Sequence, residues 1–174
     1  MSDSNENEPW GTLTALAATP ALFRPYGHLV APGNDAPMPA NAGTARRHDI
    51  TPFETDTRPG SRLIASLFET APQALPLSVR LLERHAFSQQ AIVAMQGESF
   101  VLAVALDDGK GYPDLATLRA FAFTGGGVVY GRGVWHTPII GLVSEGRFFV
   151  QSWQAGTAED CEERVVGPFL IGMD

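Results

Sequence analysis

Short apolar stretches, rich in β-branched residues and separated by turns of glycine and proline, follow one another along most of the chain. They recur at roughly 8–12 residues, and little of the pattern has the 3.6-residue period of a helix. This spacing is typical of an all-β sandwich or barrel. The strands that we predict are residues 13–16, 28–31, 46–50, 61–68, 77–84, 90–95, 98–105, 119–124, 128–130, 135–143 and 147–153.

Helix is expected only in a few short turns. Thr19-Pro20 has the signature of a helix start, with Thr19 as the N-cap and Pro20 at the first helical position, and this helix should end near Arg24. A second helical turn is expected over residues 114–118, with Asp114 as its cap.

The domain organisation is simple. Residues 1–9 are polar and acidic, which predicts a disordered tail, and residues 10–174 are predicted to form a single domain. Within that domain, residues 32–60 are rich in proline, glycine, alanine and asparagine, which predicts a loop-rich flap.

Charge and composition exclude several classes of protein. The net charge of −7, with no run of Lys or Arg to neutralise phosphates, argues against nucleic-acid binding. No run of 18 apolar residues predicts a membrane helix, and the N-terminus does not resemble a signal peptide, so we expect a cytoplasmic protein that does not bind membranes. Cys161 is the single cysteine, which excludes an internal disulfide and a cysteine-based zinc motif.

Two segments, residues 82–85 and 130–138, place ionisable side chains in apolar, strand-like surroundings. Glu83 and His85 are two residues apart, so they share one face of a strand. His136 lies in the second segment. If the two strands are neighbours in a barrel, these three side chains meet in one cavity and form the centre of an active site.

The spacing of these residues resembles the motifs of the cupin superfamily. In the first cupin motif, two ligands two apart are followed by an acidic ligand and a glycine turn. Here Glu83 takes the place of the first histidine and Gln90 that of the acid. The second motif carries one more histidine near a glycine- and proline-rich strand, as His136 does. The resemblance implies a cupin-like double-stranded β-barrel.

Three roles for this set remain open at this point. Glu83, His85, Gln90 and His136 could hold a divalent metal, since imidazole and carboxylate suit nickel, zinc, iron or manganese. The same groups could act without a metal as acid and base, since histidine titrates near neutrality. In the third case, Glu83 pairs with a neighbouring arginine on the surface and the histidines are hydrogen-bonded core residues.

Arginine and amide side chains elsewhere are candidates for substrate binding. Arg119 lies between apolar neighbours in a predicted strand and must find an anion, either a substrate carboxylate or a structural acid. Arg47 and His48 either extend the site or belong to a solvated loop, and Asn41 suits either a hydrogen-bonding loop or an ordinary surface turn.

Several blocks, in order, make the chain resemble the ureidoglycolate lyase family over about residues 13–163. The blocks are Tyr26-Gly27, Asn41-Ala42-Gly43, Arg47-His48-Asp49, Leu82-Glu83-Arg84-His85, Gln90-Ala91, Pro113-Asp114-Leu115 through Leu118-Arg119-Ala120-Phe121, and Val134-Trp135-His136-Thr137-Pro138. The resemblance implies a homodimer that splits ureidoglycolate into glyoxylate and urea, late in allantoin (purine) degradation. Nickel is associated with the family, and action without a cofactor is also compatible with it.

The implied reaction needs a base, an acid and a carboxylate clamp. For this reaction we assign His85 or His136 as the base, Glu83 as its partner or as the acid, and either Arg119 or Arg47 with His48 as the clamp. The chain departs from the family pattern at four positions, Glu69, Gly131, Thr137 and Ala155. These departures leave two alternatives: a lyase for another small carbinolamide or 2-hydroxy acid, and a barrel that senses a small ligand without catalysis.

Overall fold

Strands make up most of the protein. A computed structural model describes residues 9–32 and 36–173, so the tail predicted for residues 1–9 lies outside the described residues apart from Pro9. The strands are β1 (Thr12–Thr14), β2 (Leu16–Ala17), β3 (Gly27–Val30), β4 (Met38–Ala40), β5 (Ala45–Arg47), β6 (Arg62–Thr70), β7 (Leu77–Arg84), β8 (Gln90–Ala94), β9 (Ser99–Asp107), β10 (Pro113–Thr124), β11 (Gly127–Tyr130), β12 (Trp135–His136), β13 (Ile140–Gly141), β14 (Gly146–Gln154) and β15 (Glu162–Gly172). The helices are α1 (Pro20–Phe23) and two 3₁₀ turns, η1 (Asn41–Gly43) and η2 (Ala158–Asp160).

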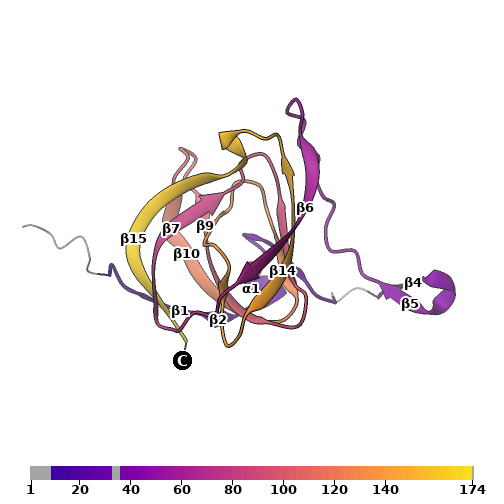
Figure 1. Cartoon of the computed structure of the whole chain (residues 1–174), viewed down its shortest axis with the longest axis horizontal. Helices are drawn as coiled ribbons and strands as arrows, with labels where there is room; N and C mark the ends of the chain where they lie inside the picture. The colour runs from indigo at the N-terminus through magenta and orange to yellow at the C-terminus, as the bar shows by residue number, and fades with distance from the viewer. Residues whose placement is uncertain (1–8, 33–35, 174) are drawn as a thin grey trace, which may run out of the picture.

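Two sheets face each other and form the expected cupin-like barrel (Figure 1). The larger sheet has the order β1-β15-β7-β12-β9-β10-β2, with β13 also paired to β9, and the smaller has the order β3-β11-β8-β14-β6. Phe100 and Leu102 of β9 pack between the sheets against Ile92 of β8 and Phe148 of β14. Along β9 they alternate with Val101 and Ala103, which are buried in a second cluster on the opposite face of the sheet.

The α1 prediction is confirmed. Pro20 stands at the start of the helix, and the Thr19 side chain accepts a hydrogen bond from the Leu22 amide. No described helix has both the length and the apolar character needed to cross a bilayer.

The predicted helical turn over residues 114–118 is wrong, because these residues belong to β10. The Asp114 carboxylate accepts from the Ala116 amide and the Asp114 carbonyl accepts from the Thr117 hydroxyl, which are the local bonds of a turn. The Thr117 hydroxyl in turn accepts from the Leu106 amide of β9. These bonds form a bulge, seen as a register shift between Asp114 and Arg119, and the chain continues as a strand.

The sequence pattern did not predict β15. Gly167-Pro168 lies in the middle of this strand and has the composition of a turn. In the structure the pairing with β7 skips across this dipeptide, from Val165 opposite Leu81 to Phe169 opposite Val79. A bulge therefore accommodates the proline, which has no amide hydrogen to give to the sheet.

One segment near the N-terminus joins the two edges of the larger sheet. β1 pairs in parallel with β15, and β2 pairs in parallel with β10 at the opposite end of the sheet order. Leu13 and Ala15 pack onto the sheet face that carries Val101, Trp135 and other buried residues. The larger sheet is therefore closed by residues 12–17.

The flap over residues 32–60 contains a hairpin that stands away from the barrel. Among the described residues β4 and β5 pair only with each other, and η1 forms the tip between them (Figure 1). We call residues 38–47 the arm. The prediction that residues 46–50 re-enter the main sheet is wrong, because Arg46 and Arg47 pair with β4 and residues 48–50 form no strand.

Candidate active site

The strand register brings Glu83 and His136 together. In the antiparallel pairing of β7 with β12, His136 lies directly opposite Glu83, and its Nε2 is 3.6 Å from Glu83 Oε1. His85 follows the end of β7, and its carbonyl accepts a hydrogen bond of 3.0 Å from the Gly133 amide. Gly133 adopts a φ of +71°, a conformation that glycine allows without strain, and this turn leads directly into β12.

Hydrogen bonds to the backbone fix the tautomer of both histidines. His85 Nδ1 lies 2.6 Å from the Asp160 carbonyl oxygen, and His136 Nδ1 lies 3.0 Å from that of Val134. A carbonyl oxygen only accepts, so each Nδ1 carries the proton and each Nε2 of the neutral rings is an acceptor. The two rings are 5.4 Å apart between centroids.

The environments of the two Nε2 atoms differ. His85 Nε2 lies 2.8 Å from the Gln90 amide nitrogen, which donates to it. His136 Nε2 is buried and has no hydrogen-bond partner among the described residues. The lone pair of His136 Nε2 is therefore unpartnered, and the Glu83 carboxylate lies 3.6 Å from it.

Burial and charge shift the pKa values in this cluster. Burial alone would raise the pKa of Glu83, but its contact with His136 and the electrostatic influence of His136 and His85 lower it below its ordinary value. Burial, together with the nearby His136, lowers the pKa of His85. Near neutral pH the site therefore contains an ionised glutamate and a neutral His85.

Tyr130 packs against the site, a position that the sequence pattern does not reveal. Its ring stacks on His136 at 4.2 Å between centroids, and its buried hydroxyl has no hydrogen-bond partner among the described residues. Burial, and then the charge of Glu83, raise the pKa of Tyr130 well above its ordinary value, so it stays a neutral phenol. Only the pairing of β11 with β8, which places Tyr130 opposite Gln90, brings it to the cluster.

A cavity of about 210 Å³ adjoins the cluster. It is lined by Phe68, Thr70, Glu83, Gln90, Ile92, Thr137, Pro138 and Ile139. Its walls combine apolar side chains with a carboxylate and an amide, which suits a small polar ligand.

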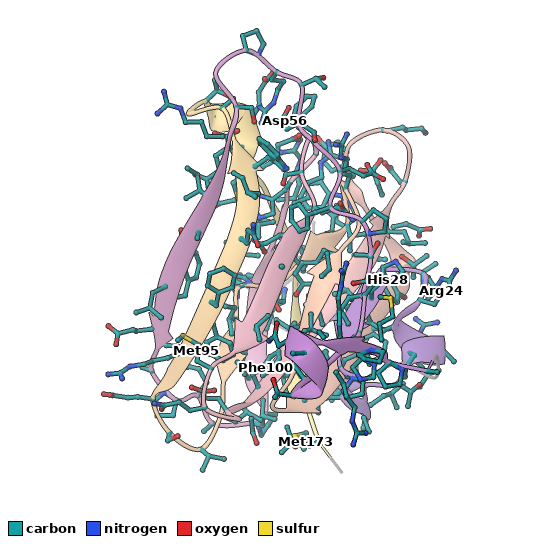
Figure 2. All side chains as sticks on the ribbon, turned by 90° about the vertical axis from the view of Figure 1, so that its right-hand side faces the viewer. Arg24, His28, Asp56, Met95, Phe100 and Met173 are labelled. Carbon is teal, nitrogen blue, oxygen red and sulfur yellow. The ribbon has the colours of Figure 1, made fainter. Side chains whose placement is uncertain are left out.

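Asp160 connects the site to a loop network. Its carbonyl holds His85, and its carboxylate accepts hydrogen bonds from the amides of residues 155–157. The carboxylate also pairs with Arg58 at 2.6 Å, and Arg58 pairs with the buried Asp56 at 2.8 Å. This chain of contacts, which begins at Asp56 near the top of Figure 2, fixes the carbonyl that orients His85.

The residues predicted to bind substrate lie outside the cavity lining, except for Gln90. Arg119 is exposed, and its guanidinium donates to the carbonyls of Ala116 and Leu118. Val104 of β9 lies between Arg119 of β10 and His136 of β12, since it is the register partner of both. The structure therefore shows Arg119 bonded to its own strand.

Arg47, His48 and Asn41 lie on the arm or directly after it. Arg47 is exposed and pairs with Asp49 at 2.7 Å, and Asn41 is exposed at the tip with a φ of +51°. His48 is half-buried and lines a hollow of about 500 Å³ formed by residues 47–52.

Each of the four departures from the family pattern makes an identifiable contact in the structure. The Thr137 hydroxyl is buried and accepts from the Ala103 amide, so it supports the sheet. Glu69 is exposed and pairs with Arg147 across the two strands. The Ala155 amide donates to Asp160, a contact that needs no side chain. Gly131 donates its amide to the Tyr26 carbonyl.

The fold and the site define a class of protein: a cupin-like barrel whose cavity carries a carboxylate beside two imidazoles. The sequence model of the family described as ureidoglycolate lyase matches residues 11–171, and the chain belongs to this family.

Relatives with that name cover most of the chain. The protein named ureidoglycolate lyase from Pseudomonas fluorescens (strain Pf0-1) is 36% identical over 155 residues, which cover 87% of this chain and 90% of the relative. That from Azotobacter vinelandii is 34% identical over 149 residues, covering 84% and 87%. That from Burkholderia mallei (strain NCTC 10229) is 35% identical over 141 residues, covering 80% and 81%.

Proposed function

We propose that this protein is a ureidoglycolate lyase, which splits ureidoglycolate into glyoxylate and urea in allantoin degradation. Family membership and the names of the relatives support this activity. The structural observation on which it depends is the unpartnered His136 Nε2 beside the Glu83 carboxylate, next to a small cavity.

The substrate is a carbinolamide, in which one carbon bears a hydroxyl, a carboxylate and a ureido nitrogen. In the proposed reaction His136 Nε2 takes the hydroxyl proton, the C–O bond becomes a carbonyl, and the C–N bond breaks. The proton then passes from the imidazolium to the departing urea nitrogen. No water is consumed, so the reaction is an elimination.

The charges of the site favour this division of roles. The lowered pKa of Glu83 keeps it ionised, so it suits the role of partner to the imidazolium better than that of the acid. The Nδ1–H bond of His136 to the Val134 carbonyl holds the ring so that Nε2 faces Glu83. His85, held by Asp160 and Gln90, adds a second neutral imidazole at the same place.

The same residues fit a divalent metal. One ligand atom each from Glu83, His85 and His136 lie within 4.8 Å of one another. Both histidines give Nδ1–H to a backbone carbonyl, which is the arrangement that orients imidazole ligands in metal sites. Gln90 is the predicted fourth ligand. A bound metal would supply Lewis acidity that lowers the pKa of the substrate hydroxyl.

Replacement of His136 tests the proposal. We expect His136→Asn to lower kcat at least about tenfold in an assay that couples glyoxylate formation to a dehydrogenase, because a positioned acid–base group contributes about 10²–10⁴. His28→Gln is the matched control, since His28 lies on β3 outside the cavity lining, well below Asp56 in Figure 2. Circular dichroism checks that both variants fold.

Two results would count against the proposal. If the wild-type protein releases no glyoxylate from ureidoglycolate, the activity is not that of a ureidoglycolate lyase. If His136→Asn and His28→Gln turn over the substrate equally fast, His136 is not the base.

A further inference from the structure

The arm, residues 38–47, has almost no surface of its own barrel to rest on. β4 and β5 make their main contacts with each other and with η1, and Figure 1 shows them lying away from the two sheets. Met38, Arg46 and Arg47 are all exposed. An isolated two-stranded hairpin is only marginally stable in water, so this arm needs another surface.

The tip of the arm also has an unfavourable backbone. Asn41, Ala42 and Gly43 are three consecutive residues with positive φ, and of these only glycine adopts that conformation without cost. Alanine at a φ of +55° persists only where its surroundings impose it. Packing against another molecule would supply those surroundings.

The cavity, in turn, lacks a cation. Its lining contains no arginine or lysine among the described residues, although the substrate of the proposed function is a carboxylate anion. The arginines of the nearby loops are engaged, since Arg58 pairs with Asp56 and Asp160, and Arg132 pairs with Glu54. The site is therefore acidic, with Glu83 and the nearby Glu163 contributing negative charge.

We propose that the arm docks on a second copy of this chain and delivers Arg47 to the cavity of that copy, where it binds the substrate carboxylate. The positive charge of Arg47 complements the acidic site of the second copy. Arg47 pairs with Asp49 through both Nε and Nη2, the geometry that a carboxylate requires. Both side chains are exposed, and an exposed pair is weak, so the guanidinium can exchange Asp49 for a substrate carboxylate. The identity of the bound anion rests on the proposed function.

Disulfide trapping tests the docking without any assay of activity. Cys161 is the single cysteine, it is exposed, and its Sγ lies 3.8 Å from Glu83 Oε2. In Arg47→Cys, oxidation catalysed by copper–phenanthroline should link the arm of one chain to Cys161 of the other. Non-reducing electrophoresis should then show a dimer, which disappears when Cys161→Ser is added.

Each possible result of the disulfide trapping has a different meaning. An intramolecular disulfide, seen as a monomer of altered mobility, would mean that the arm folds onto its own barrel. Absence of any link, or a monomer in gel filtration of the wild-type protein, would also overturn the proposal. Neither result depends on whether ureidoglycolate is the substrate, so failure of the docking and failure of the proposed function are distinguishable.

Single variants and then mixed dimers test whether Arg47 of one chain reaches the cavity of the other. We expect Arg47→Ala to raise KM about tenfold to a hundredfold, the effect of losing charge-assisted hydrogen bonds. Arg46→Ala removes the same charge from the opposite face of β5 and should leave KM unchanged.

Coexpressed Arg47→Ala and His136→Asn chains should form mixed dimers in which one of the two sites has both residues intact. Those mixed dimers should combine the KM of the wild-type protein with a kcat well above that of His136→Asn, a combination that neither variant shows alone. If isolated mixed dimers stay as impaired as the single variants, Arg47 acts in its own chain or not at all.

Discussion

Gln90 controls the state of His85 through one hydrogen bond. Its amide donates to His85 Nε2 at 2.8 Å, while His85 Nδ1 donates to the Asp160 carbonyl. Both ring nitrogens therefore have partners that suit the neutral imidazole, and burial lowers the pKa of His85 in the same direction. The charge of the site at neutral pH thus depends on this residue being an amide.

Gln90→Glu should raise the pKa of His85, because a carboxylate at this position stabilises the imidazolium. If neutral His85 is needed for activity, the acid limb of the kcat/KM profile moves to higher pH, by about one unit. The pH–rate profile and an NMR titration of the histidine ring measure the shift. Gln151→Glu is the control, since Gln151 alternates with the buried Val150 and Ser152 and faces away from the core. An acid limb that stays in place in Gln90→Glu would contradict this role.

The sequence could identify only some of the residues that form the site. Glu83 and His85 were predicted together because a strand repeats every two residues, and His136 because it stands in an apolar segment. The Asp160 carbonyl could not be predicted, since every residue carries the same backbone group and only the fold selects one. Tyr130 was missed because its stacking on His136 depends on which strands are neighbours.

At the scale of elements, an ion-pair network joins two loops behind His85. Arg58 contacts both Asp56 and Asp160, and the Asp160 carboxylate caps the amides of residues 155–157. Asp56 and Arg58 are mostly shielded from water, with side-chain exposures of 2% and 15%. Such a pair resists solvent screening better than an exposed one, so it can hold the loops in place.

Asp56→Asn should therefore reduce the free energy of unfolding and change its dependence on pH. Hydrogen bonds from Arg58 outweigh burial and lower the pKa of Asp56. The stabilisation is then complete above the unfolded-state pKa of 3.8 and is lost as the pH falls below it towards the folded-state value. Urea unfolding at several pH values should show the wild-type protein losing its advantage over Asp56→Asn below about pH 4. Glu69→Gln, which breaks an exposed pair, should change stability little.

Most of the strands, but not all, could be predicted from the sequence. Residues 77–84 match β7 because their apolar positions are bounded by prolines and polar residues. Prediction failed where turn-forming residues lie inside a strand, at residues 114–118 and at Gly167-Pro168. In both places a bulge lets the sheet continue, and a bulge depends on the neighbouring strand, which the local sequence does not describe.

At the scale of the whole molecule, residues 12–17 close the larger sheet. β1 takes up the free edge of β15 and β2 that of β10. The Trp10 amide donates to the Pro168 carbonyl and the Ala15 amide to that of Gly172, so the segment is bonded along its length. Both edges would otherwise expose unpaired backbone groups.

Deletion of residues 1–17 should consequently lower the free energy of unfolding by at least about 2 kcal/mol, because it removes the packing of Leu13 and the hydrogen bonds of both edges together. Urea unfolding followed by far-UV circular dichroism measures this loss without relying on Trp10, which the deletion removes. Deletion of residues 1–8 is the matched control, since it leaves β1 and β2 in place. Equal midpoints for the two deletions would mean that the sheet does not depend on this closure. Because β15 pairs with β7, which carries Glu83, the longer deletion should also weaken the site, and activity should fall with stability.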